Sequence, residues 1–183
     1  MLILKLNYYI LRFLKLITLN KCLKNKVSSA YNKYSLACYR AQGAEIGENT
    51  LLIECKLSGS SKGDRFYIGN NCTITGVTLL AHDASPTLFL PELVNYEPSY
   101  LPGSRSSYRD PIHIGDNVFI GWGTIILPGV TIGSNVVIGA GSLVNKDIPD
   151  NCVAVGNPAK TIKNIEAYKS EYYHRFAKYP ERF

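Results

Sequence analysis

The sequence predicts a mainly β protein built as a parallel solenoid, and three observations support this prediction. Between residues 112 and 144, an aliphatic residue returns at every sixth position. The fifth position of each six-residue unit is small or β-branched, and glycine follows four of the aliphatic residues. The aliphatic set is Ile114, Ile120, Ile126, Ile132, Ile138 and Val144, and the small or β-branched set is Val118, Thr124, Val130, Val136 and Ser142.

A period of six separates this stretch from the common regular structures. An amphipathic α-helix returns apolar residues after three and four positions, and a half-buried strand returns them after two. Six residues fit one flat face of a coiled parallel β structure, in which the aliphatic and the small residue both point inward. We expect the glycines to supply the backbone freedom that a sharp corner between two faces needs.

The composition is that of one globular domain with short appendages. The chain has 183 residues, of which 46% are hydrophobic and 19% charged, and its net charge is +6. Such a charge suits nucleic acid, an anionic membrane surface or an anionic cofactor. Because the basic residues gather toward the two ends and no recognition motif is present, we do not expect nucleic-acid binding. Five scattered cysteines without a CxxC pair favour structural thiols in a reducing compartment.

Residues 1–44 form a basic N-terminal segment in which no Asp or Glu occurs. Within residues 1–26 we expect an amphipathic helix, which Lys5, Arg12 and Lys15 make too polar to span a membrane. No signal-peptide cleavage site is apparent. Two interpretations stay open: the helix lies on an anionic membrane surface, or it covers the end of the solenoid. Its predicted apolar face comprises Leu2, Leu6, Tyr9, Ile10, Phe13, Leu14 and Ile17.

The repeats occupy residues 45–163, and residues 27–44 are predicted to be a linker or a second short helix. A loop at residues 58–64 interrupts the repeats first, and a long excursion at residues 83–111 interrupts them again. Five prolines in the excursion argue against regular structure there, and loops of this length are often functional. Residues 164–183 are predicted to form a short helix that closes the final coil.

His82 is the candidate for chemistry among the three histidines of the chain. It lies where a regular coil gives way to the excursion, whereas His113 precedes a core isoleucine and should point outward, and His174 lies in the tail. A single histidine is more often structural than catalytic. Only its position at the junction between coil and excursion favours a catalytic role for His82. No serine, cysteine or lysine stands in a recognisable nucleophile motif.

The six consecutive hexads resemble the repeat signature of the left-handed β-helix acyltransferases. The resemblance implies a left-handed coil with three faces and a homotrimer whose active sites lie between subunits. It is closest to sugar and polysaccharide O-acetyltransferases of the maltose and galactoside type, in which a histidine at the position of His82 is the general base. Imidazole, with an ordinary pKa near ~6.5, can take the proton of an acceptor hydroxyl. Asp83 would orient this base or bind the acceptor, although neighbours on an extended segment point to opposite sides.

The same resemblance implies acetyl-CoA as the acyl donor and no metal. Residues 138–149 resemble the stretch that borders the cofactor, and residues 155–160 resemble the closing element near its phosphates, which suit lysine. Trp122 would line the thioester groove or pack between subunits, and a backbone N–H near Gly121 is the candidate oxyanion donor. A solvated basic end is the alternative for the lysines. The implied cofactor-binding residues are Gly121, Trp122, Ala140, Asn145, Lys146, Lys160 and Lys163.

The favoured hypothesis is direct acetyl transfer in a ternary complex to a hydroxyl of a glycan, a surface polysaccharide or its precursor. The Asn-rich segment and N-terminal acceptor segment of the maltose and galactoside enzymes are replaced here, which disfavours a free mono- or disaccharide. Acetylation of an antibiotic or other small hydroxyl compound is the enzymatic alternative, and a non-catalytic scaffold at a membrane surface is a second. A zinc enzyme needs three converging histidines and is poorly supported. The expected location is cytoplasmic, with peripheral contact at the inner face of the membrane if residues 1–26 bind lipid.

Overall fold

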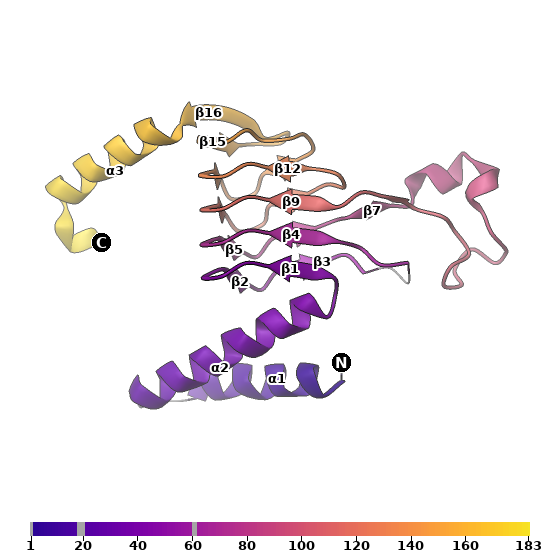
Figure 1. Cartoon of the computed structure of the whole chain (residues 1–183), viewed down its shortest axis with the longest axis horizontal. Helices are drawn as coiled ribbons and strands as arrows, with labels where there is room; N and C mark the ends of the chain where they lie inside the picture. Colours follow the sequence, from indigo (N-terminus) through magenta and orange to yellow (C-terminus); the bar gives the residue numbers. More distant parts are fainter. Residues whose placement is uncertain (1, 18–20, 60–61) are drawn as a thin grey trace.

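Three parallel sheets form the faces of a prism, and successive turns of the chain add strands to each face (Figure 1). The computed structural model describes residues 2–17, 21–59 and 62–183, without the side chains of Leu2, Ile3, Lys5, Leu16, Ile17, Lys21 and Cys22. The first face contains β1 (Ala44–Ile46), β4 (Phe66–Ile68), β9 (Ile112–Ile114) and β12 (Thr131–Ile132). The second contains β2 (Leu51–Ile53), β5 (Thr73–Thr75), β10 (Phe119–Ile120), β13 (Val137–Ile138), β15 (Cys152–Val155) and β16 (Lys160–Asn164). The third contains β3 (Lys56–Leu57), β6 (Thr78–Leu79), β11 (Ile125–Ile126) and β14 (Leu143–Val144).

The core consists of the residues that the six-residue period selects. The six aliphatic residues from Ile114 to Val144 are at most 4% exposed, and so are the five small or β-branched residues. Each aliphatic residue stacks on its equivalent in the next coil, as Ile114 does between Ile68 and Ile132. The predicted solenoid is therefore confirmed, and its faces number three.

Asparagine, rather than glycine, makes the corner between the first and second faces. Five asparagines there have φ between 54° and 58°, a left-handed conformation that asparagine tolerates. Their side-chain amides form a continuous ladder, in which Asn71 donates to Asn117 (2.7 Å) and Asn117 donates to Asn135 (3.0 Å). The whole set is Asn49, Asn71, Asn117, Asn135 and Asn151.

The glycines that follow the aliphatic residues have a different role from the one expected. Gly115 does not adopt a positive φ, but a Cβ there would lie 2.6 Å from Ser134 Oγ and 2.8 Å from the Gly133 carbonyl carbon. Glycine is needed at this position because successive coils approach too closely for a side chain. The prediction that these glycines supply backbone freedom at the corners was therefore wrong.

Two helices, α1 (Leu2–Ile17) and α2 (Lys21–Arg40), stack at the N-terminal end of the prism (Figure 1). Helix α2 covers the first coil, where the Tyr39 hydroxyl donates to the Cys55 carbonyl (3.2 Å) and accepts from the Cys55 N–H (3.1 Å). Helix α1 packs on α2, with the Tyr8 and Tyr31 ring centroids 5.1 Å apart. The second helix is longer than the sequence predicted, beginning at Lys21. Within the described residues, no helix combines the length and apolarity that crossing a bilayer requires.

The excursion leaves and rejoins the prism through a short antiparallel pair of strands. His82 and Asp83 in β7 (His82–Asp83) pair with Arg109 and Tyr108 in β8 (Tyr108–Arg109). Between them lie the 3-10 helices η1 (Ser85–Leu88) and η2 (Pro91–Leu93). The prediction of no regular structure was too strict, because proline in the first turn of each short helix has the φ that a helix start needs.

The C-terminal segment ends the solenoid with a strand rather than with a helix. Strand β16 turns back antiparallel along β15, and α3 (Ile165–Lys178) then leads away from the prism (Figure 1). The Asn164 side chain caps α3 by accepting from the Ala167 N–H (2.8 Å), and no residue of α3 is buried. After α3 comes η3 (Pro180–Arg182). The tail forms the predicted helix, but the expectation that this helix closes the final coil was wrong.

The asparagine ladder predicts a graded loss of stability at Asn117. We expect Asn117→Ala to lower the free energy of unfolding by about 2 to 3 kcal/mol, because it removes two amide contacts and puts alanine in a left-handed conformation. Asn117→Gly should cost about 1 kcal/mol less, since glycine adopts that conformation without steric penalty. Urea unfolding followed by circular dichroism measures both. Two variants as stable as the wild type would show that the ladder contributes nothing.

Candidate functional site

The imidazole of His82 is held by a buried carboxylate. Nδ1 of His82 lies 2.7 Å from Oδ2 of Asp64, whose side chain is 0% exposed. The histidine side chain itself is 26% exposed, so part of the ring remains open to solvent. Both residues lie where the chain passes from the third face to the first, Asp64 after coil one and His82 after coil two.

Three segments converge on the Asp64 carboxylate. The Ser58 hydroxyl donates to Oδ2 (2.6 Å) and accepts in turn from the Ala81 N–H (2.9 Å). Nε of Arg109, from the returning end of the excursion, lies 3.8 Å from Oδ1. A buried carboxylate is costly unless charges and hydrogen bonds compensate it. Ser58 and His82 compensate Oδ2, whereas Oδ1 has, among the described residues, no hydrogen-bond partner and only the Arg109 charge nearby. Ser58 and the base of the excursion therefore both help to fix this carboxylate.

This arrangement determines which nitrogen of His82 can act. An ionised carboxylate only accepts hydrogen bonds, so the bonded Nδ1 must carry the proton. The lone pair is then on Nε2, the nitrogen that Asp64 does not contact. Such a pair can remove a proton from a bound hydroxyl, with the carboxylate orienting the ring and stabilising the imidazolium.

Asp83 does not occupy the position beside the His82 ring. Its carboxylate accepts from the Ser85 N–H (2.8 Å) and the Ser85 hydroxyl (2.9 Å), at the start of η1. These hydrogen bonds hold the pKa of Asp83 below its ordinary value. The two side chains diverge because neighbours on a strand point to opposite sides. The sequence therefore pointed to the wrong orienting residue, and Asp64 takes that place. A role of Asp83 in binding the acceptor stays a prediction.

Asn145 and Lys146 lie on the same edge of the prism as His82, two coils further along. Strand β6 pairs with β11 and β11 with β14, so the residues that follow these strands stack along one edge. Both side chains are exposed. The edge could thus carry a long ligand that runs past His82, and the predicted contacts of Asn145 and Lys146 with the donor remain open to test.

Gly121, Trp122 and Ala140 gather at the corner between the second and third faces. Trp122 is 56% exposed, and its ring covers Gly76, where a Cβ would lie 2.3 Å from the ring. A Cβ on Gly121 would lie 2.6 Å from the Ala140 nitrogen. This corner is separated from His82 by the width of the third face.

Two backbone N–H groups at this corner cannot supply the oxyanion donor that the sequence suggested. The Gly121 N–H donates to the Ile138 carbonyl (2.9 Å), and the Gly123 N–H donates to the Gly76 carbonyl (3.0 Å). Both donors are used by the hydrogen-bond ladder between coils. That assignment was therefore wrong for these two groups.

The two C-terminal lysines differ in their surroundings. Lys160 is exposed on β16. Lys163 is half-buried, and its Nζ lies 2.8 Å from Oε2 of Glu171 on α3. Hydrogen bonds from Lys163 and Arg175 hold the pKa of Glu171 below its ordinary value. Lys163 thus joins β16 to α3, and Lys160 is the better placed of the two to meet a phosphate.

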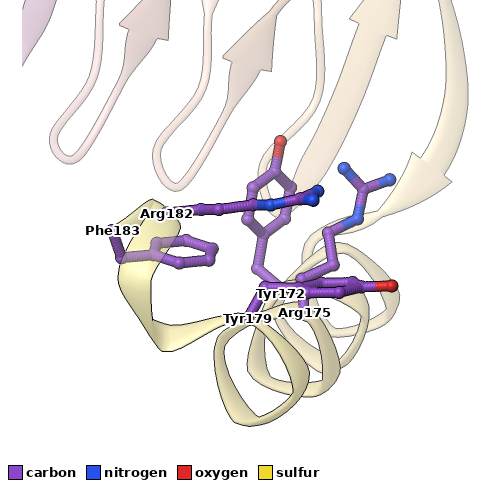
Figure 2. A pocket seen from close by; sticks show the side chains of 5 residues that line it. All are labelled: Tyr172, Arg175, Tyr179, Arg182 and Phe183. Atoms are coloured by element: carbon purple, nitrogen blue, oxygen red, sulfur yellow. The ribbon is translucent and has the colours of Figure 1, made fainter.

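Other features lie away from His82. His113 is exposed on the first face and stacks on Tyr67, with centroids 4.7 Å apart, so its predicted outward direction is confirmed. A cavity of about 370 Å³ in the C-terminal tail is lined by two arginines and three aromatic residues and includes no predicted site residue (Figure 2). Its lining is Tyr172, Arg175, Tyr179, Arg182 and Phe183. In the described part of the chain, no cluster of three or more His, Cys, Asp or Glu side chains could hold a metal ion.

Comparison with known proteins gives the family. Residues 111–146 match the family model described as "Bacterial transferase hexapeptide (six repeats)". Protein CapG of Staphylococcus aureus is 44% identical over 139 residues, which cover 72% of each chain. The chain belongs to the hexapeptide-repeat acetyltransferase family.

Two further relatives extend the comparison. A putative acetyltransferase of Schizosaccharomyces pombe is 43% identical to this acetyltransferase over 108 residues, which cover 57% of this chain and 52% of that protein. The crystal structure of a maltose O-acetyltransferase from Clostridium difficile is 30% identical, covers 89% of this chain and 88% of its own, and gives a TM-score of 0.48.

The contact between Asp64 and His82 predicts a strong effect of a small change. We expect Asp64→Asn to lower kcat for acetyl transfer by up to about 10⁴-fold with little change in KM, because the amide carries no charge to stabilise the imidazolium. Asp83→Asn should leave kcat within about twofold. Steady-state kinetics of both variants decide between the two carboxylates. The opposite ranking would return the orienting role to Asp83.

Proposed function

We propose that this acetyltransferase transfers the acetyl group of acetyl-CoA to a hydroxyl of a glycan, with His82 as general base. The observation that carries the proposal is the partly exposed imidazole held by the buried Asp64 at the base of the excursion. A carboxylate on one nitrogen and solvent access for part of the ring are what a general base needs, and paired titratable groups of this kind are enriched at catalytic sites.

The chemistry that this pair supports is direct transfer in a ternary complex. Nε2 of His82 takes the proton of the acceptor hydroxyl while the oxygen attacks the carbonyl carbon of the thioester. The carbon–sulfur bond then breaks, and the departing thiolate takes the proton from the imidazolium. Asp64 keeps the ring oriented and offsets its transient positive charge. Holding both substrates in line supplies a large part of the rate enhancement.

A covalent acyl-cysteine is not part of the proposal. Cys55 and Cys72 are buried in the solenoid, and burial raises the pKa of both thiols. A thiol that stays protonated is a poor nucleophile. Cys152 is also buried, beside the Pro149 carbonyl. These properties favour the structural role predicted for these three cysteines, and we take the acceptor oxygen as the attacking atom.

Exposed side chains along the prism support a donor site. Asn145 and Lys146 are on the edge that carries His82, and Lys160 is available for a phosphate near the closing strand. Lysine binds phosphate as a point charge, which suits the several phosphates of CoA. We infer that the pantetheine lies along the prism with its thioester toward His82.

An apolar corner in coil three supports an assembly of several copies. Phe119, Trp122 and Ile125 are 43%, 56% and 38% exposed, on two outer faces and the corner between them. Large apolar groups gathered in this way mark contact surfaces. We infer a homotrimer in which this corner meets a neighbouring prism, so that residues of two subunits line each cofactor groove. A closed ring of three is an ordinary symmetry for such a contact.

Exposed tyrosines on the excursion support the proposal that the acceptor contains a sugar ring. Tyr96, Tyr100 and Tyr108 are exposed along it, 47%, 83% and 55% respectively. Tyr108 is fixed by a hydrogen bond to Asp110 (2.7 Å), which raises the pKa of the tyrosine. Tyrosine offers a flat apolar face together with a hydroxyl, and so can both stack on a sugar ring and bond to its hydroxyls.

Replacing the base should separate catalysis from binding. We expect His82→Ala to lower kcat by about 10²- to 10⁴-fold, because proton removal from the acceptor is lost. Binding of CoA should stay within about threefold, since the imidazole is not proposed to hold the nucleotide. Thiol release measures the rate and isothermal titration measures the affinity. A variant with near wild-type turnover would remove His82 from the mechanism.

The acceptor class can be tested without a variant. Wild-type protein is supplied with acetyl-CoA and a panel of polysaccharides, their oligosaccharide fragments, and small hydroxylated drugs. We expect the polymers and longer fragments to have a kcat/KM at least about tenfold above that of the drugs, because an extended acceptor contacts more of the excursion. Product mass spectrometry identifies the ester. Preferential acetylation of the drugs would overturn the glycan assignment and leave the acetyltransferase activity intact.

A further inference from the structure

One face of α1 is apolar and exposed. Leu6, Tyr9, Ile10 and Phe13 are 58%, 62%, 48% and 62% exposed. Their spacing of three and four residues places them on one side of the helix, and we call these four residues the outer face. Leu14, at its border, is 36% exposed. The side chains of Leu2 and Ile17, which the sequence assigned to the same face, lie outside the described part of the chain.

The opposite face of α1 is already occupied. The Tyr8 hydroxyl lies 3.1 Å from the hydroxyl of Tyr31 on α2, and the Lys15 ammonium lies 5.0 Å from the centre of the Tyr31 ring. Arg12 forms an ion pair with Glu54 in the first coil (2.9 Å). These contacts fix the rotation of α1. Tyr9 lies at the border of the outer face, where it also lines a pocket with Ser35 and Tyr39 of α2. Covering the solenoid does not explain the exposure of Leu6, Ile10 and Phe13.

The basic composition of the segment that carries the outer face favours an anionic partner. No acidic residue precedes Glu45, whereas this part of the chain carries many basic ones. Lys24 and Lys26 at the start of α2 are exposed. The basic residues of this part are Lys5, Arg12, Lys15, Lys21, Lys24, Lys26, Lys33 and Arg40. A second copy of the same segment would bring like charges together, so self-association through this face is opposed electrostatically.

We propose that α1 lies in the plane of an anionic lipid surface, with the outer face inserted between the headgroups. Leu6, Ile10 and Phe13 would enter the boundary with the acyl chains, and Tyr9 would place its hydroxyl at the headgroup level. Lys24 and Lys26 would add to the attraction of this basic segment toward the anionic surface. An orientation in the plane suits a helix of 16 residues, too short and too polar to cross the bilayer.

This placement would hold the catalytic pair near the membrane. Helix α2 covers coil one, and Asp64 and His82 leave coils one and two, the two coils nearest the helices (Figure 1). An acceptor presented at the lipid surface would then need to extend only a short way along the prism. The docking inference rests on α1 and α2 alone and does not depend on the proposed acceptor.

Vesicle binding by the full-length protein tests the proposal. Sedimentation is compared for vesicles of phosphatidylcholine alone and of phosphatidylcholine mixed with phosphatidylglycerol. We expect binding to the anionic vesicles that weakens with added salt, because the basic residues act through screened charge. A variant that combines Leu6→Gln, Tyr9→Gln, Ile10→Gln and Phe13→Gln should bind at least about tenfold more weakly, since it loses the inserted apolar groups.

Two further variants separate the contributions. Lys24→Gln with Lys26→Gln should weaken binding by up to about fivefold for each charge removed. Tyr173→Gln with Phe176→Gln removes equally exposed aromatic groups from α3 and should leave vesicle binding unchanged. Circular dichroism checks that each variant folds. If the outer-face variant fails to fold, the lysine variant and the salt dependence still decide.

Three results would overturn the proposal. Wild-type protein that ignores anionic vesicles has no docking face of this kind. Equal loss of binding in the α3 variant would show that any exposed aromatic group produces the effect. The third result would come from analytical ultracentrifugation of the outer-face variant. If this variant forms a smaller assembly than the wild type, and neither protein binds vesicles, the outer face is a contact between copies of the chain.

Discussion

The coils of this prism stay in register because large aliphatic side chains stack on one another along its axis. Ile68, Ile114 and Ile132 form one such column, each at most 4% exposed. The same stacking brings Asp64 and His82 together, since they leave the same edge of the prism in successive coils. Their hydrogen bond is therefore a consequence of the repeat. Removing the stacking would leave a charged carboxylate without the partners that allow its burial.

The core was predictable because one pattern decides it. The residues from Ile114 to Val144 carry the period without interruption, and burial follows the period at every one of these positions. Asp64 was not identified because its role depends on an interrupted coil, where the loop at residues 58–64 hides the alignment with His82. No interval marked the pair, because equivalent positions in these two coils are 22 residues apart, as Leu57 and Leu79 are. The asparagine corner, by contrast, was visible in the sequence, because Asn117 and Asn135 lie at equivalent positions three hexads apart.

The terminal helices show a different limit. Helix α1 has apolar residues on both sides, with Leu4 and Leu11 half-buried and Ile10 and Phe13 exposed. Periodicity detects the amphipathic face but does not say which side packs on the protein. That choice depends on partners distant in sequence, such as Glu54. Likewise, the pattern of the tail predicted α3 but not the strand before it. Strand β16 closes the last coil by pairing antiparallel with β15, and no local pattern in the tail indicates this pairing.

The account depends on the His82 ring standing beside the point where an acetyl thioester arrives. The most direct measurement is a crystal structure of the protein with acetyl-CoA bound. We expect the thioester carbonyl carbon near enough to Nε2 of His82 for one hydroxyl to fit between them, with about 3 Å on each side. The Asp64 contact to Nδ1 should persist. A thioester bound on another edge of the prism, out of reach of His82, would contradict the account.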